Sequence, residues 1–172
     1  MIMRPGQQLL LPANPLFIWS SLFLAMVVNM LPLGRTPWMP DLLALVLVFW
    51  SVHQPLRVGI GAAFFFGIAM DVHQAALLGQ HALAYTALSY FAITIHRRLL
   101  WFTVPSQAVQ VLPLFAAAHA IEVGIRMLAG GVFPGVSLLL APVIESLLWP
   151  VVSIILLAPQ RRAPDPDENR PL

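Results

Sequence analysis

The stretch that decides the fold class is residues 59–98, GIGAAFFFGIAMDVHQAALLGQHALAYTALSYFAITIHRR. Asp71 is its only formally charged residue before Arg97. A hydrocarbon core about 30 Å thick is crossed by about 20 apolar residues in an α-helix. The stretch therefore predicts two membrane-crossing helices, from about Leu56 to Met70 and from Ala75 to Ile95, with a short turn after Asp71.

Further apolar segments lie on both sides of these two helices. They run from Pro15 to Leu33, from Trp38 to about His53, from Leu99 to about Ile121 and from Val136 to Ala158. We predict an all-α fold, a polytopic membrane protein that forms a compact bundle of six transmembrane helices. Because the second and third segments are short, five crossings with a tight hairpin at residues 53–55 are the alternative. Residues 1–14 are then a cytoplasmic segment, 15–158 the transmembrane domain, and 159–172 a disordered cytoplasmic tail rich in proline and charge.

The composition excludes several classes of protein. Hydrophobic residues make up 59% of the 172 residues, and nine basic and seven acidic residues give a poor polar surface for a soluble domain. Cysteine is absent and every basic residue is Arg, which excludes disulfides, thiolate metal sites and a catalytic lysine. No hydrolase or nucleotide-binding motif is present. We predict a protein that is not an enzyme, with no cofactor, no metal and no nucleic-acid partner.

The arginines predict the orientation in the membrane, since cytoplasmic loops are enriched in basic residues. With six crossings and a cytoplasmic N-terminus, the cytoplasmic side holds Arg4, Arg57, Arg97, Arg98, Arg161, Arg162 and Arg170. The outer side holds only Arg35 and Arg126. Both chain ends are therefore expected in the cytoplasm. The five tryptophans lie mostly near predicted helix ends, as in an interfacial aromatic belt: Trp19, Trp38, Trp50, Trp101 and Trp149.

Gly59, Ala63, Gly67 and Asp71 recur every four residues and share one helix face. Small residues at this spacing let helices approach closely in a membrane. We therefore expect tight packing through this face and read it as the docking face for a partner. Asp71 would point into the bundle or toward that partner, and the alternative is a solvated helix end.

The other polar residues within apolar segments are candidates for buried contacts, because an ionisable group near the bilayer centre costs about 2.5–3.5 kcal/mol on insertion scales. Asp41 has helix capping as its alternative explanation. Glu122 and Arg126 are spaced for an ion pair within one helix, with His119 one turn earlier. Glu145 would meet Arg126 or another polar group, or stay protonated. His81, with Asp71, His73 and Gln80, forms an outer cluster whose spacing is unspecific for a metal.

An ordered series of residues between 40 and about 98 carries a family resemblance. It consists of Pro40-Asp41-Leu42-Leu43, Leu47-Val48, Trp50, Pro55, Gly59, Ala63-Phe64, Gly67, Asp71, Leu78-Gly79-Gln80-His81-Ala82-Leu83 and Tyr90. The series resembles the MreD family of bacterial rod shape-determining membrane proteins. The size of the chain, its short loops and its arginine-bearing tail also fit.

The resemblance implies a non-enzymatic component of the cell-elongation (rod) complex in the bacterial cytoplasmic (inner) membrane. Such a component binds MreC and helps couple MreB filaments to the peptidoglycan synthases, a RodA-type transglycosylase and a class B penicillin-binding protein. Whether it forms a homo-oligomer within the complex is open. Members of the family are also similar in fold to the substrate-binding subunits of vitamin-uptake transporters. The alternative function is therefore such a subunit, with Asp41, Asp71, His81 and Glu122 lining a pocket.

Overall fold

The structure of the protein is a computed structural model that describes residues 13–32 and 36–160. Regular structure in this part of the chain is entirely helical, with no strand, as the sequence predicts. The helices are α1 (Pro15–Met30), α2 (Leu42–His53), α3 (Ile60–Gln74), α4 (Gln80–Leu99), α5 (Val104–Leu128) and α6 (Leu140–Leu157), with 3-10 helices η1 (Val136–Leu139) and η2 (Ala158–Gln160) flanking α6. The predicted segments 1–14 and 159–172 lie almost entirely outside the described residues.

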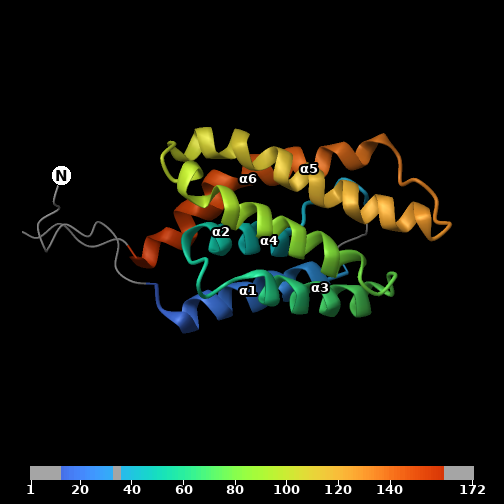
Figure 1. The fold of residues 1–172 in the computed structure, drawn as a ribbon, viewed down its shortest axis with the longest axis horizontal. Helices are drawn as coiled ribbons and strands as arrows, with labels where there is room; N and C mark the ends of the chain where they lie inside the picture. Colours follow the sequence, from blue (N-terminus) through green and yellow to red (C-terminus); the bar gives the residue numbers. More distant parts are fainter. Residues whose placement is uncertain (1–12, 33–35, 161–172) are drawn as a thin grey trace, which may run out of the picture.

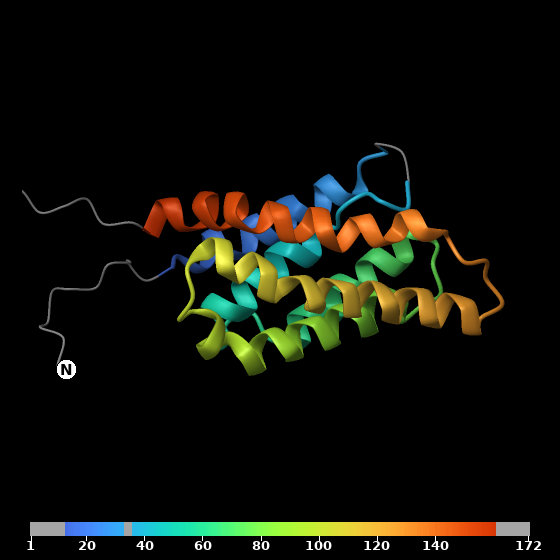
Figure 2. The same ribbon diagram turned by 90° about the horizontal axis from the view of Figure 1, so that it is seen from above.

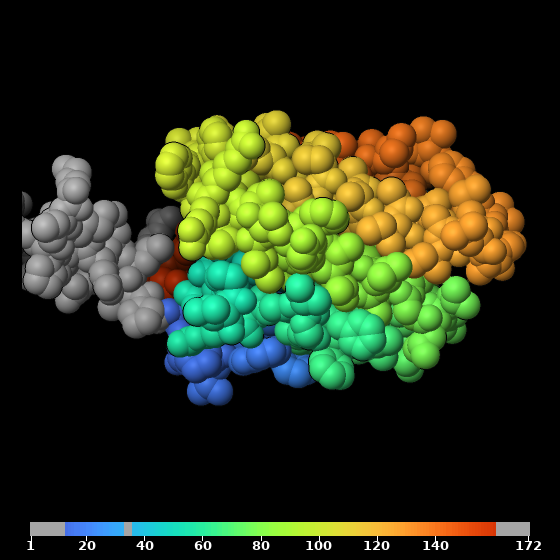
Figure 3. All heavy atoms as spheres, in the orientation of Figure 1, coloured from blue at the N-terminus to red at the C-terminus, as the bar shows by residue number. Residues whose placement is uncertain are grey.

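The helices run antiparallel along one long axis, and α2 lies at their centre (Figures 1 and 2). Every residue from Leu43 to Val52 is buried, because α2 packs against α1, α4 and α6. Around it α3 packs on α4, α4 on α5 and α5 on α6. In the space-filling view α3, α4 and α5 lie against one another along the length of the bundle (Figure 3).

Local sequence signals set the helix ends. Asn14 accepts a hydrogen bond from the Leu16 N–H at 3.0 Å, and Pro15 begins α1, where a missing N–H costs nothing. Asp41 caps α2 through the Ala44 N–H at 2.9 Å. The turn between α3 and α4 needs left-handed backbone at Ala75 (φ 50°) and Gly79 (φ 103°).

The two ends of the bundle differ in charge. The start of α1, the end of α6 and the α2–α3 and α4–α5 connections share one end, and the α3–α4 and α5–α6 connections lie at the other (Figure 1). Arg57, Arg97 and Arg98 lie at the first end, where the Arg57 guanidinium donates to the Ala13 carbonyl at 2.8 Å. Of the described arginines, only Arg126 lies near the opposite end. The four described arginines thus divide between the two ends as the sequence analysis groups them, and the membrane side of each end stays a prediction.

Helix lengths refine the predicted crossings. Two helical segments, Val104–Leu128 and Val136–Gln160, are long and apolar enough to cross a membrane by length and composition. The segment expected to begin at Trp38 begins instead at Leu42, so α2 has 12 residues. At 1.5 Å per residue it is about 18 Å long, well short of the hydrocarbon core. Because its residues 43–52 are buried among the other helices, its backbone does not face lipid.

Two tryptophans depart from the expected aromatic belt. Trp50 and Trp149 are fully buried. The Trp50 indole donates to Ser21 Oγ at 2.8 Å, and that of Trp149 donates to Gln107 Oε1 at 3.1 Å. Both rings therefore fill the core and join neighbouring helices, because each indole N–H has a polar partner inside the bundle.

Candidate functional site

Asp71 closes the turn between α3 and α4. Its carboxylate is 1% exposed and accepts hydrogen bonds from the backbone N–H groups of Gly79 at 2.8 Å, His81 at 2.7 Å and Ala82 at 3.3 Å. His81 Nδ1 also lies 2.8 Å from Asp71 Oδ1. The first turn of α4 has no cap of its own, so Asp71 supplies that cap from the neighbouring helix. The inward orientation expected for Asp71 is confirmed.

Gly67 marks a very close approach of α3 to α4. A Cβ atom on Gly67 would lie 2.3 Å from Ala82 Cα and 2.6 Å from Ala82 N, which only a glycine avoids. Ala63 is fully buried on the same helix face as Gly67 and Asp71. Gly59 precedes the helix as its N-cap, and a Cβ there would meet only the Pro55 carbonyl at 3.7 Å. Gly67 and Asp71 thus contact the start of α4 within the chain, Gly59 does not, and the role of the stripe in partner binding stays a prediction.

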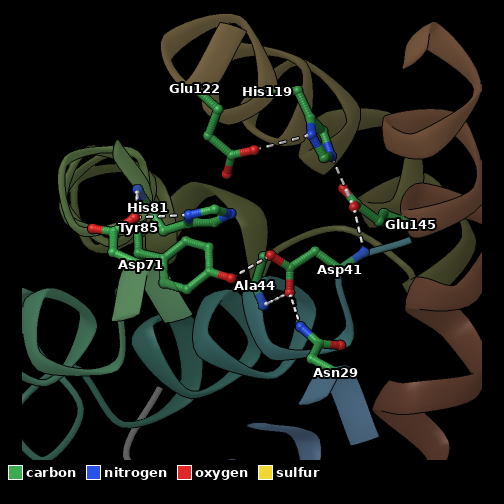
Figure 4. Close-up of polar contacts among 9 residues, drawn as sticks. All are labelled: Asn29, Asp41, Ala44, Asp71, His81, Tyr85, His119, Glu122 and Glu145. Atoms are coloured by element: carbon green, nitrogen blue, oxygen red, sulfur yellow. Dashed lines mark hydrogen bonds and ion pairs between the residues drawn. The ribbon is translucent and has the colours of Figure 1, made fainter. Parts of the chain in front are cut away.

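Asp41 joins four helices (Figure 4). Its Oδ1 accepts from the Asn29 amide of α1 at 2.6 Å and from the Ala44 N–H of α2 at 2.9 Å. The Tyr85 hydroxyl of α4 donates to its Oδ2. Its own N–H donates to Glu145 Oε1 of α6 at 2.8 Å. Helix capping, the alternative explanation for Asp41, is therefore correct but accounts for only one of these contacts.

Glu145 and His119 connect α6 to α5 at the same level of the bundle (Figure 4). His119 Nε2 lies 2.9 Å from Glu145 Oε1, and its Nδ1 lies 3.7 Å from Glu122 Oε2. Glu145 is 1% exposed, and its second oxygen, Oε2, has no hydrogen-bond partner among residues 13–32 and 36–160. Glu145 thus meets a polar group inside the bundle, one of the outcomes expected from the sequence.

The predicted ion pair between Glu122 and Arg126 is not formed. Within the described residues, Glu122 pairs with His119, one turn earlier on α5. Arg126 is exposed near the end of α5, beyond the buried part of the helix. The i, i+4 spacing allowed the pair, but an exposed arginine keeps its hydration while a half-buried glutamate gains more from an interior partner.

Together these contacts link every helix of the bundle. The Asp71–His81 pair adjoins the Asp41 group, since the His81 and Tyr85 rings have centroids 6.0 Å apart. Polar contacts between transmembrane helices contribute about 0.6 kcal/mol each on average. In the described part of the chain no group of three or more His, Cys, Asp or Glu is placed to hold a metal ion. The arrangement holds helices in register, and Asp41, Asp71 and His81 all form hydrogen bonds to other protein groups.

Several residues of this network are not predicted by the sequence analysis. Asn29 and Tyr85 complete the Asp41 contacts, and Ser51 and Ser89 join α2 to α4 through hydroxyls 2.5 Å apart. All four side chains are uncharged, so the cost of burying a charge does not mark them as interior contacts. Asn29 could have been identified from the sequence, because it is a polar amide at the end of an otherwise apolar helix.

Two features of this bundle are typical of helical membrane proteins: two of its helical segments are long and apolar enough to cross a membrane, and buried polar side chains bond one helix to another. The family model of the rod shape-determining protein MreD matches residues 12–161, and the chain belongs to this family. The family consists of membrane proteins that determine rod shape as structural components and is not known for enzymes. No solved structure matches the chain.

Proposed function

We propose that this protein is a multi-pass component of the cell-elongation complex in the bacterial cytoplasmic (inner) membrane. It binds MreC and helps couple MreB filaments to the RodA-type and class B penicillin-binding synthases. The family membership supports this role. The structural observation behind the proposal is that the buried acidic side chains hold the helices together. Asp41, Asp71 and Glu145 all form hydrogen bonds to other parts of the chain, which fits a rigid scaffold.

The proposed topology has six crossings with both ends in the cytoplasm. The charge difference between the ends of the bundle supports it, since Arg57, Arg97 and Arg98 share the end where α1 begins and α6 ends. The short helix α2 crosses with residues 43–52 buried among its neighbours, and α3 crosses packed along the longer α4. The Asp41 and Asp71 groups then lie in the outer half of the membrane.

The proposal is tested by replacing the chromosomal gene with a tagged, full-length copy in the native rod-shaped host. We expect rod shape to be retained and MreC to co-purify from solubilised membranes. Loss of the gene should give round cells, because scaffolding by this protein would be lost. A host that stays rod-shaped without the gene, or a tagged protein that restores shape without any association with MreC, would contradict the proposal.

A matched pair of variants links the fold to this role. Gly67→Ile places a branched side chain against Ala82. Gly61→Ile is on the same helix, but no atom lies within 4 Å of a Cβ at position 61. We expect rod shape to be lost with Gly67→Ile and kept with Gly61→Ile. The proportion of rod-shaped cells is the measurement, with the amount of membrane-inserted protein as its control.

A further inference from the structure

The end of α4 presents two arginines at the surface of the bundle. Arg97 and Arg98 are both exposed in the last turn of this helix. Within the described part of the chain, neither guanidinium has an ion-pair partner. Arg57 lies at the same end of the bundle but differs, because its guanidinium donates to the Ala13 carbonyl (Figure 1). The donors of Arg97 and Arg98 are therefore available to a partner outside the described chain.

Large apolar side chains follow the two arginines directly. Leu100 is 44% exposed, Trp101 90% and Phe102 42%. The helical turn continues into these residues, since the Trp101 N–H donates to the Arg98 carbonyl at 3.2 Å. The cations and the exposed apolar side chains are therefore presented within about one turn of each other. We call residues 97–102 the arginine–tryptophan turn.

Charge at this end of the bundle has one sign among the described residues. Three of the four described arginines lie here, and the fourth, Arg126, lies near the opposite end. The described acidic residues all lie in the half of the bundle toward that opposite end: Asp41, Asp71, Glu122 and Glu145. A surface that holds cations without neighbouring acids attracts anions. The arginine–tryptophan turn is therefore suited to an anionic partner.

The apolar side chains indicate which kind of anion fits. An acidic protein segment offers carboxylates but little apolar surface, so it would leave Trp101 in water. An anionic phospholipid joins a phosphate to apolar chains, and tryptophan and arginine both favour the level of the headgroups. The connection between α4 and α5 consists of residues 100–103. It is too short to carry the turn away from the ends of two helices that belong to a membrane-protein family.

We propose that the arginine–tryptophan turn binds the headgroup of an anionic phospholipid of the phosphatidylglycerol type. Arg97 and Arg98 donate to the phosphate, because a guanidinium matches two phosphate oxygens at once. Trp101 lies beside the glycerol and the first carbons of the acyl chains. The bound lipid holds the end of α4 and the start of α5 at the level of the headgroups. The inference needs the membrane location of the family but not the binding of MreC, so the two are tested independently.

The first test measures lipid selectivity in the full-length protein, reconstituted into phosphatidylcholine vesicles. The vesicles contain either brominated phosphatidylglycerol or brominated phosphatidylcholine, whose bromine atoms quench nearby tryptophan fluorescence. We expect stronger quenching by the anionic lipid, and Trp101→Phe should remove this excess. Inorganic phosphate should not displace the lipid. Equal quenching by the two lipids, an excess that persists in Trp101→Phe, or displacement by phosphate overturns the inference.

The second test removes the charges. Arg97→Gln and Arg98→Gln should each lower the affinity for brominated phosphatidylglycerol about fivefold, and the double variant about 25-fold, which is the usual effect of arginines near an anionic surface. Arg126→Gln is the matched control, because Arg126 is exposed at the opposite end, and it should leave the affinity unchanged. Circular dichroism in detergent checks that the variants fold. Full affinity in the folded double variant, or an equal loss with Arg126→Gln, overturns the inference.

The third test asks whether a protein occupies the turn instead. A photo-crosslinking residue replaces Trp101 in the full-length protein in native membranes, and mass spectrometry identifies the adduct. We expect phospholipid adducts in which anionic headgroups exceed their share of the membrane lipids. This enrichment should be lost when Arg97→Gln and Arg98→Gln are added. A protein adduct in place of lipid, or headgroups in the same proportions as in the whole membrane, overturns the inference.

Discussion

Gly67 of α3 lies so close to Ala82 of α4 that a Cβ on the glycine would be 2.3 Å from the Ala82 Cα. Four residues later, one turn along α3, the Asp71 carboxylate accepts hydrogen bonds from the N–H groups that begin α4. The close approach and the cap depend on one another, since the Asp71 carboxylate reaches the first turn of α4 only when the helices are in contact. The α3–α4 hairpin is therefore a unit whose parts can be tested separately.

The first prediction concerns the close approach. Gly67→Ala should lower the free energy of unfolding by about 1–3 kcal/mol, because the added methyl group meets backbone atoms that cannot move independently. Gly61→Ala should be neutral or stabilising by up to about 1 kcal/mol, since its Cβ meets nothing and alanine favours the helix. Thermal unfolding in detergent, followed by circular dichroism, measures both. Equal melting temperatures for the two variants would refute the prediction.

The second prediction concerns the cap. Asp71→Asn keeps the size of the side chain but replaces one acceptor oxygen with an amide that faces N–H donors. We expect a loss of about 1.5–3 kcal/mol, the usual worth of hydrogen bonds to a charged group. Amide hydrogen exchange at residues 79–82 should become faster. His73→Asn, at an exposed position of the same turn of α3, serves as the control and should leave exchange at residues 79–82 unchanged.

How far the sequence predicts this molecule depends on the kind of residue. The helical class follows from the length of the apolar segments, and the inward orientation of Asp71 follows from the cost of placing a charge in hydrocarbon; both are found. The central position of α2 does not follow, because a helix buried in protein and one facing lipid are equally apolar. Burying an uncharged side chain such as Asn29 or Tyr85 costs too little free energy to mark it in the sequence as an interior contact. The partner of Glu122 depends on which residue the fold brings near it.

The third prediction concerns the bond between α4 and the start of α2. Tyr85→Phe removes the hydroxyl that donates to Asp41 and should cost about 1.5–3 kcal/mol of unfolding free energy. Tyr90→Phe is the matched control, because Tyr90 is 54% exposed and should tolerate loss of its hydroxyl. A double-mutant cycle of Tyr85→Phe with Asp41→Asn isolates the pair. Additive effects of the two changes would show that the two side chains are not coupled.

The last prediction separates charge from hydrogen bonding at Glu145. Its Oε1 accepts from the Asp41 N–H and lies 2.9 Å from His119 Nε2, so an acceptor at this position is needed whether or not the group is charged. Glu145→Gln keeps an oxygen there, and we expect it to cost about 1 kcal/mol or less, because relief from burying a charge offsets the imperfect amide. Glu145→Ala leaves the Asp41 N–H without its acceptor and opens a cavity, and should cost at least about 3 kcal/mol. Unfolding in detergent and rod shape in cells should rank the variants in the same order. A Gln variant as damaging as the Ala variant would mean that the carboxylate charge, rather than its acceptor oxygen, holds α6 to the centre of the bundle.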